Sequence, residues 1–124
     1  MKKTVWVIND GYDDVWYDCE LEKKLPDDFD YEYFEEINFD RNDYPNICII
    51  DYGFVGREKI DLMIELYIKN LLKNNVHVVI QSAVASYVRD EINKNKNLQG
   101  INCINHGIDG IRYYLNVTYK NESN

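Results

Sequence analysis

Polar side chains that could bind a cation or a phosphoryl group lie at the ends of four apolar segments of the sequence. In chain order they are Asn9 and Asp10, then Asp51, then Ser82, and finally Asn105 and His106. Carboxylates and other oxygen donors, with water completing the shell, are the ligands that Mg²⁺ takes. Asp10 and Asp51 are therefore candidate metal ligands, with Ser82 and His106 beside them. Either carboxylate alone is better explained as a cap of the helix or turn that follows it, whereas the set together favours a functional site.

The apolar segments are near-continuous runs of β-branched and other apolar residues. They are Thr4–Asn9, Ile47–Asp51, Val76–Ser82 and Ile101–Asn105. Runs of this length, buried on both faces, suit a parallel sheet covered by helices. A fifth strand is predicted where Phe29, Tyr31 and Tyr33 alternate with acidic residues, as in an exposed edge strand.

Helical periodicity separates these strands. The clearest pattern runs from Ile60 to Leu72, with apolar residues at i, i+3, i+4 and i+7. A second helix is marked by Val84, Val88 and Ile92, and a third by Ile108, Ile111 and Leu115, which closes the chain. A short helix is predicted from Asp13 to Lys24, before Pro26. Few residues separate Tyr33 from Ile47, so any helix between them is expected to be short or missing.

Strand–helix alternation predicts one doubly wound α/β domain that spans residues 1–124. We expect a five-stranded, mainly parallel sheet in the order 2-1-3-4-5, with helices on both faces. In such a sheet, ligands bind beyond the carboxyl ends of the strands. The candidate residues lie there, which places them at one edge of the sheet.

At these strand ends the sequence resembles the receiver domain of response regulators. Receivers carry an acidic pair after the first strand, a phosphoacceptor Asp after the third, and a Ser or Thr followed by Ala after the fourth. The matching residues are Asn9-Asp10, Asp51 in CIIDYG, and Ser82-Ala83. The intervals of 41 residues from Asp10 to Asp51 and 31 from Asp51 to Ser82 are close to those of receivers. The resemblance implies that Asp51 accepts a phosphoryl group, Asp10 holds Mg²⁺ and Ser82 bonds a phosphate oxygen.

Two positions depart from the receiver pattern. The first acid of the pair is Asn9, and the Lys that ends the fifth strand of receivers is replaced by Asn105 or His106. Loss of that Lys removes a fixed positive charge that stabilises a phosphorylated carboxylate. A protonated His106 would replace it in part, in a pH-dependent way. We therefore predict a divergent or pseudo-receiver that acts through protein contacts and binds Mg²⁺ weakly.

The charge distribution favours a second class of function. Residues 10–43 hold 14 of the 22 acidic residues and three of the 14 basic ones, in a chain of net charge −8. Such a field repels phosphate backbones and disfavours nucleic-acid binding, whereas a protein with a basic surface suits it. The alternative is an acidic inhibitor, of the immunity or phage anti-defence type, that covers a basic partner through residues 13–43. A solvated face that only maintains solubility would explain the same charge.

Other classes have little support in the sequence. There is no Gly-x-Gly-x-x-Gly, Walker A or Gly-x-Ser-x-Gly motif. Cys19, Cys48 and Cys103 are scattered, without the spacing of a zinc site or a disulfide framework. No apolar run approaches the roughly 20 residues of a membrane span, and the apolar start is too short for a signal peptide. We expect a cytoplasmic protein whose two apolar-run cysteines, Cys48 and Cys103, are buried.

Overall fold

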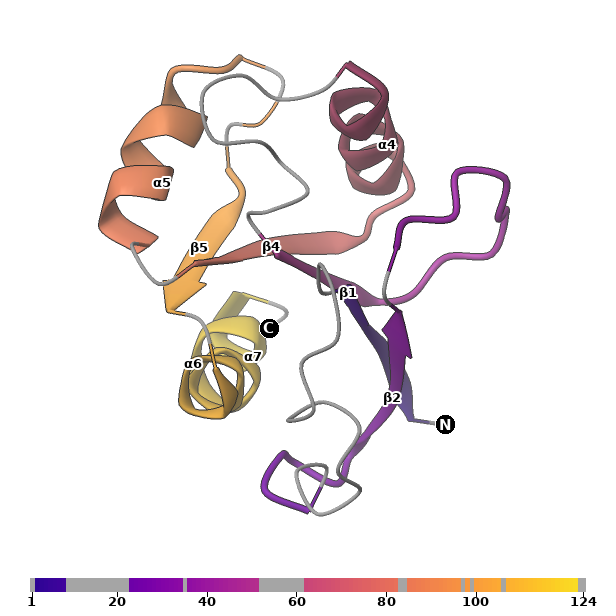
Figure 1. The fold of residues 1–124 in the computed structure, drawn as a ribbon. Coiled ribbons are helices and arrows are strands. Elements are labelled where there is room, and N and C mark those ends of the chain that lie inside the picture. Colours follow the sequence, from indigo (N-terminus) through magenta and orange to yellow (C-terminus); the bar gives the residue numbers. More distant parts are fainter. Residues whose placement is uncertain are drawn as a thin grey trace.

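Five parallel strands form one sheet, seen at the centre of Figure 1. The computed structural model describes residues 2–8, 23–34, 36–51, 62–82, 85–96, 98, 100–105 and 107–122. The strands are β1 (Lys3–Ile8), β2 (Phe29–Phe34), β3 (Ile47–Asp51), β4 (His77–Ser82) and β5 (Asn102–Asn105). Their order is β2-β1-β3-β4-β5, and every neighbouring pair is parallel. The predicted fold class and strand order are confirmed.

Helices follow β3, β4 and β5, as the apolar periodicity predicts. They are α4 (Leu62–Lys73), α5 (Ala85–Asn93) and α6 (Ile108–Tyr113), which continues through a π-helical turn η1 (Tyr114–Thr118) into α7 (Tyr119–Glu122). Of the helix predicted over residues 13–24, the structure describes only Lys23 and Lys24, which form a turn. Within the described ranges, no helix has the length and apolar character needed to cross a bilayer.

The sheet is covered on both faces because its central strands are apolar on both sides. On one face, α4 and α5 pack Ile68, Leu71, Val88 and Ile92 against a cluster that includes Ile50 and Ile80. On the other face, the C-terminal helical segment packs Ile111 and Leu115 against a cluster that includes Ile49 and Val79. Alternate residues of one strand thus enter different cores. Cys48 and Cys103 are buried in the first core, as predicted.

A loop replaces the helix that would connect β2 to β3. Residues 36–46 contain a turn, bends and irregular segments but no helix. The guanidinium of Arg41 lies 4.6 Å from the centroid of the Trp6 ring and 5.3 Å from that of Phe34. Its Nη2 also donates to Oδ2 of Asp43 at 2.9 Å. This side chain contacts aromatic rings of both β1 and β2, so a cation on two rings holds the loop after β2 against the sheet.

Candidate functional site

Three candidate residues lie at the carboxyl edge of the sheet, where β3, β4 and β5 end. Asp51 is the register partner of Gln81, and Ser82 is the register partner of Asn105. The structure therefore brings the predicted Asp51 and Ser82 to neighbouring strands at one edge. Asn9, Asp10 and His106 lie outside the described residues. The Asp10–Asp51 metal pair and the role of His106 stay predictions.

Strand alternation divides this edge between the two faces of the sheet. Val79 belongs to the core under α6 and Ile80 to the core under α4 and α5, so Gln81 follows Val79 and Ser82 follows Ile80. Gln81 is fully buried and Ser82 is 7% exposed, whereas Asp51 is half-buried. Gln81 was not singled out from the sequence. The only sequence feature that marks Gln81 is its polar side chain near the end of the apolar run VHVVIQS.

The described side chains at the carboxyl edge include oxygen groups of the kind that Mg²⁺ takes. Asp51 offers a carboxylate, Gln81 an amide oxygen and Ser82 a hydroxyl, all of which are hard oxygen ligands. In the part of the chain that the structure describes, no three His, Cys, Asp or Glu side chains lie close enough to share a metal ion. Asp51 and Gln81 share one face of the sheet and Ser82 lies on the other, so a Mg²⁺ site here would need a further carboxylate, which Asp10 would supply.

Two glycines set the path of the chain from β5 into α6. Gly107 has φ of 119°, a conformation that side chains with a Cβ rarely adopt. At Gly110, a Cβ would collide with the backbone carbonyl oxygen of Asn105. The absence of a side chain at Gly110 therefore lets α6 approach the end of β5 closely, which fixes Asn105 at the carboxyl edge.

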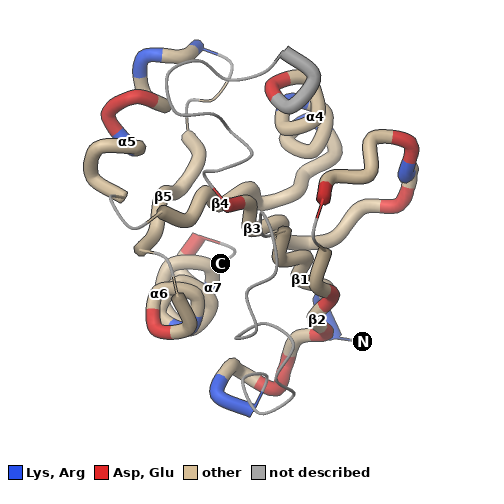
Figure 2. The backbone as a smooth tube through the Cα atoms, in the orientation of Figure 1, with Lys and Arg blue, Asp and Glu red and all other residues tan. Residues whose placement is uncertain are grey.

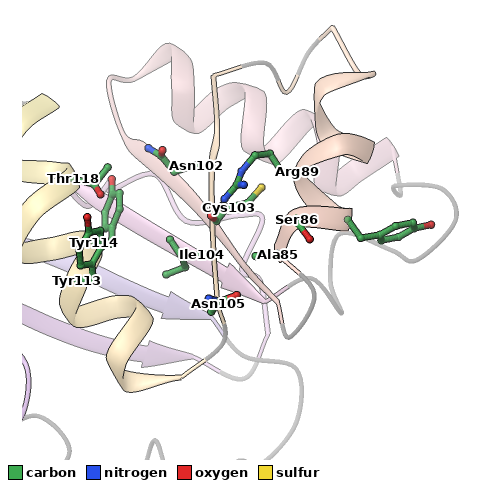
Figure 3. A pocket seen from close by; sticks show the side chains of 11 residues that line it. Ala85, Ser86, Arg89, Asn102, Cys103, Ile104, Asn105, Tyr113, Tyr114 and Thr118 are labelled. Atoms are coloured by element: carbon green, nitrogen blue, oxygen red, sulfur yellow. Dashed lines mark hydrogen bonds between the residues drawn. The ribbon is translucent and has the colours of Figure 1, made fainter.

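A groove of about 680 Å³ lies beside β5, which is the last strand of the sheet (Figure 3). We call it the β5 groove. Helix α5 forms one side through Tyr87 and Arg89, and the C-terminal helical segment forms the other through Tyr113 and Tyr114. These helices cover opposite faces of the sheet, so the groove follows the strand edge between them. An edge strand has no ladder partner on its outer side, so the groove runs along backbone groups of β5 that pair with no further strand.

The chemistry of the β5 groove is polar and aromatic. Arg89 is the one charged side chain among its described lining residues, and its Nη2 donates to the carbonyl oxygen of Cys103 in β5 at 3.0 Å. Tyr87 and Tyr113 are 54% and 64% exposed. Tyr114 is fully buried, and its hydroxyl has no hydrogen-bond partner among the described residues. Burial raises the pKa of Tyr114, so this hydroxyl stays protonated.

A second surface is acidic, and we call it the acidic surface. Its described acids lie in the turn before β2, in β2 and in the following loop (Figure 2): Asp27, Asp28, Asp30, Glu32, Glu36, Asp40 and Asp43. Arg41 pairs with Asp43 and approaches Glu32 at 3.7 Å, while Lys120 approaches Asp28 at 3.7 Å. The hydrogen bond from Arg41 lowers the pKa of Asp43. The remaining acids give this side of the molecule a negative field.

Comparison with known proteins adds one structural likeness. No protein-family model and no curated protein matches the sequence. A solved chain described as an adenylate cyclase from Rhodopirellula baltica superposes with a TM-score of 0.54 and is 14% identical. The match covers 99% of this chain and 97% of that chain. The fold is flavodoxin-like. Receiver domains are built on the same strand order, and at this identity the likeness shows the fold alone.

Proposed function

We propose that the chain is a divergent, receiver-like regulatory domain that acts by binding another protein rather than by turning over a substrate. The observation that carries this proposal is the β5 groove. It combines the open edge of β5 with two exposed tyrosines and one arginine. Aromatic residues and Arg are the side chains most enriched at the centres of protein interfaces. The cyclase activity of the Rhodopirellula baltica chain is not carried over, because 14% identity supports no shared chemistry.

Partner capture from the native host tests this proposal. The bait is the full chain, compared with a Tyr87→Ala/Tyr113→Ala variant and with Leu66→Ala as control. Leu66 is 55% exposed on α4 and does not line the β5 groove, so the control removes a similarly exposed apolar side chain elsewhere. We expect the groove variant to lose about tenfold or more in capture of a specific protein, as hot-spot residues do. Equal capture by all three baits would refute the groove as the binding surface.

The carboxyl edge supports a finer version of the same function. We propose that Asp51 is a weak phosphoacceptor, that Asp10 and Asp51 hold Mg²⁺, and that Ser82 bonds a phosphate oxygen. The Asp51 carboxylate would attack a small phosphodonor such as acetyl phosphate, forming an acyl phosphate and releasing acetate. His106, when protonated, would stand in for the missing Lys. Support for this chemistry comes from Asp51 and Ser82, which end the neighbouring strands β3 and β4 at the carboxyl edge of the sheet.

Labelling and metal titration test this chemistry separately from partner binding. Acetyl phosphate with Mg²⁺ should add one phosphoryl group at Asp51, more at pH 6 than at pH 8 if His106 contributes. Millimolar Mg²⁺ should raise the melting temperature of the wild type, and Asp51→Asn should abolish both effects. Modification at another acid, or none at any pH from 6 to 8, would remove Asp51 as acceptor.

The acidic surface favours a second candidate function. We propose, as the alternative, an inhibitor of the immunity or phage anti-defence type that covers a basic protein through residues 13–43. Its described part carries seven acids between Asp27 and Asp43, with Arg41 as the one base between them. Association should then slow steeply with salt, because exposed charges are screened over roughly 10 Å at 0.1 M. Reversal of Asp27, Asp28 and Asp30 to Lys should weaken capture well over tenfold while Asp51→Asn leaves it unchanged.

A further inference from the structure

A second groove lies within the acidic surface, at the end of β2 and along the loop after it. It has a volume of about 610 Å³, and we call it the Phe39 groove. Its described lining combines aromatic rings with carboxylates: Tyr33, Phe34, Glu36, Ile37, Asn38, Phe39 and Asp40. None of these lining residues is basic, and Phe39 is 45% exposed. Neither Glu36 nor Asp40 forms an ion pair with any residue that the structure describes. The groove therefore presents aromatic side chains and two carboxylates that have no cation partner among the described residues.

The same chemistry already holds a guanidinium next to this groove. Arg41 lies over the rings of Trp6 and Phe34, and its nitrogens bond the carboxylate of Asp43. Phe34 belongs both to this arrangement and to the lining of the Phe39 groove. Aromatic faces attract cations electrostatically, and a planar guanidinium can stack on a ring while it pairs with a carboxylate. The molecule thus stabilises one guanidinium by this combination of groups, and beside it the Phe39 groove places the exposed Phe39 near the carboxylates of Glu36 and Asp40.

We propose that the Phe39 groove receives an arginine side chain presented by a basic protein partner. The inference rests on the proposed acidic-surface function and names the group that this surface recognises. Arginine fits better than lysine, because the exposed Phe39 offers an aromatic ring for stacking and Glu36 and Asp40 offer carboxylates for the fork of N–H donors. A phosphate-bearing ligand such as RNA is disfavoured, since its backbone would meet the carboxylates of the acidic surface.

A peptide titration tests the proposal on the full chain. The probe is acetyl-Gly-Arg-Gly-amide, and its control is the citrulline peptide, which keeps the shape of the side chain without its charge. We expect the arginine peptide to shift the backbone amide signals of residues 36–40 saturably in NMR spectra of the labelled protein, with an affinity about tenfold or more above that of the citrulline peptide. Equal affinities, or shifts confined to other residues, would overturn the proposal.

Two matched double variants separate the groove from general electrostatic attraction. Glu36→Gln/Asp40→Asn neutralises the groove, and Asp27→Asn/Asp30→Asn removes the same charge from elsewhere on the acidic surface. We expect the groove variant to lose about tenfold in affinity for the arginine peptide and the control variant less than about threefold. An equal loss in both would overturn a defined arginine site. If that happened while partner capture still depended on Asp27, Asp28 and Asp30, the acidic-surface function would stand and only the groove assignment would fall.

Discussion

The Tyr114 hydroxyl offers a stability test with an unusual sign. Tyr114 is fully buried under the C-terminal helical segment, and its hydroxyl lacks a hydrogen-bond partner among the described residues. A buried polar group without a partner costs roughly 1–3 kcal/mol in desolvation. Tyr114→Phe removes that oxygen and keeps the ring in the core. The substitution should therefore raise the free energy of unfolding by about 1 kcal/mol.

Tyr31→Phe is the matched control, because the hydroxyl of Tyr31 donates to the carbonyl oxygen of Pro26 at 2.6 Å. Loss of that hydrogen bond should lower the free energy of unfolding by about 1 kcal/mol. For a chain of 124 residues, 1 kcal/mol corresponds to a shift in melting temperature of roughly 4 °C. The two variants should therefore move the melting temperature in opposite directions.

Urea denaturation and calorimetry on the wild type and both variants measure these shifts. A Tyr114→Phe variant that loses as much stability as Tyr31→Phe would refute the reasoning, because its hydroxyl would then be bonded in the folded state. An unchanged dependence on urea concentration would show that neither variant alters the surface exposed on unfolding.

Three further predictions follow from single contacts. Gly110→Ala should destabilise the fold by about 1 kcal/mol despite the better helix propensity of Ala, because the added Cβ meets the carbonyl oxygen of Asn105; unchanged or higher stability in urea would contradict this close approach. Cys48 should resist alkylation until the chain unfolds, since it is fully buried and burial raises its pKa; rapid labelling under native conditions, read by peptide mass spectrometry, would show otherwise. Arg41 lowers the pKa of Asp43 from 3.8, so their pairing stabilises the fold above about pH 4 and is lost as pH falls through the lowered value. Asp43→Asn should therefore flatten the acid limb of a plot of melting temperature against pH, and an unchanged limb would count against the pairing.

Most of the fold could be predicted because it is encoded locally. Apolar runs such as ICIID mark strands that are buried on both faces, and the alternation in FDYEYF marks an edge strand. Right-handed crossovers then leave few possible strand orders. The π-helical turn Tyr114–Thr118 was not predicted. Buried Leu115 and Tyr119 still fit α-helical spacing, and the spacing of apolar residues does not reveal which backbone hydrogen bonds form.

The candidate site could be predicted only where strand ends define it. Asp51 and Ser82 were found because each ends an apolar run, and parallel strands bring such ends to one edge. Arg89 and Tyr114 were missed, since the β5 groove depends on two helices that pack on opposite faces of the sheet. The sequence showed Arg41 only as a basic residue within the acidic segment. Its place on two aromatic rings follows from the path of the loop after β2, which sequence periodicity does not specify.

We propose above all that the chain regulates a protein partner that binds in the β5 groove. The most direct test is the dissociation constant of the captured, purified partner for the wild type, for Tyr87→Ala/Tyr113→Ala and for Leu66→Ala. We expect a loss of about tenfold or more for the groove variant and a change of less than about twofold for the control. Wild-type affinity in the groove variant would contradict the claim. It would do so most clearly if reversal of Asp27, Asp28 and Asp30 to Lys abolished binding, because the acidic surface would then be the functional one.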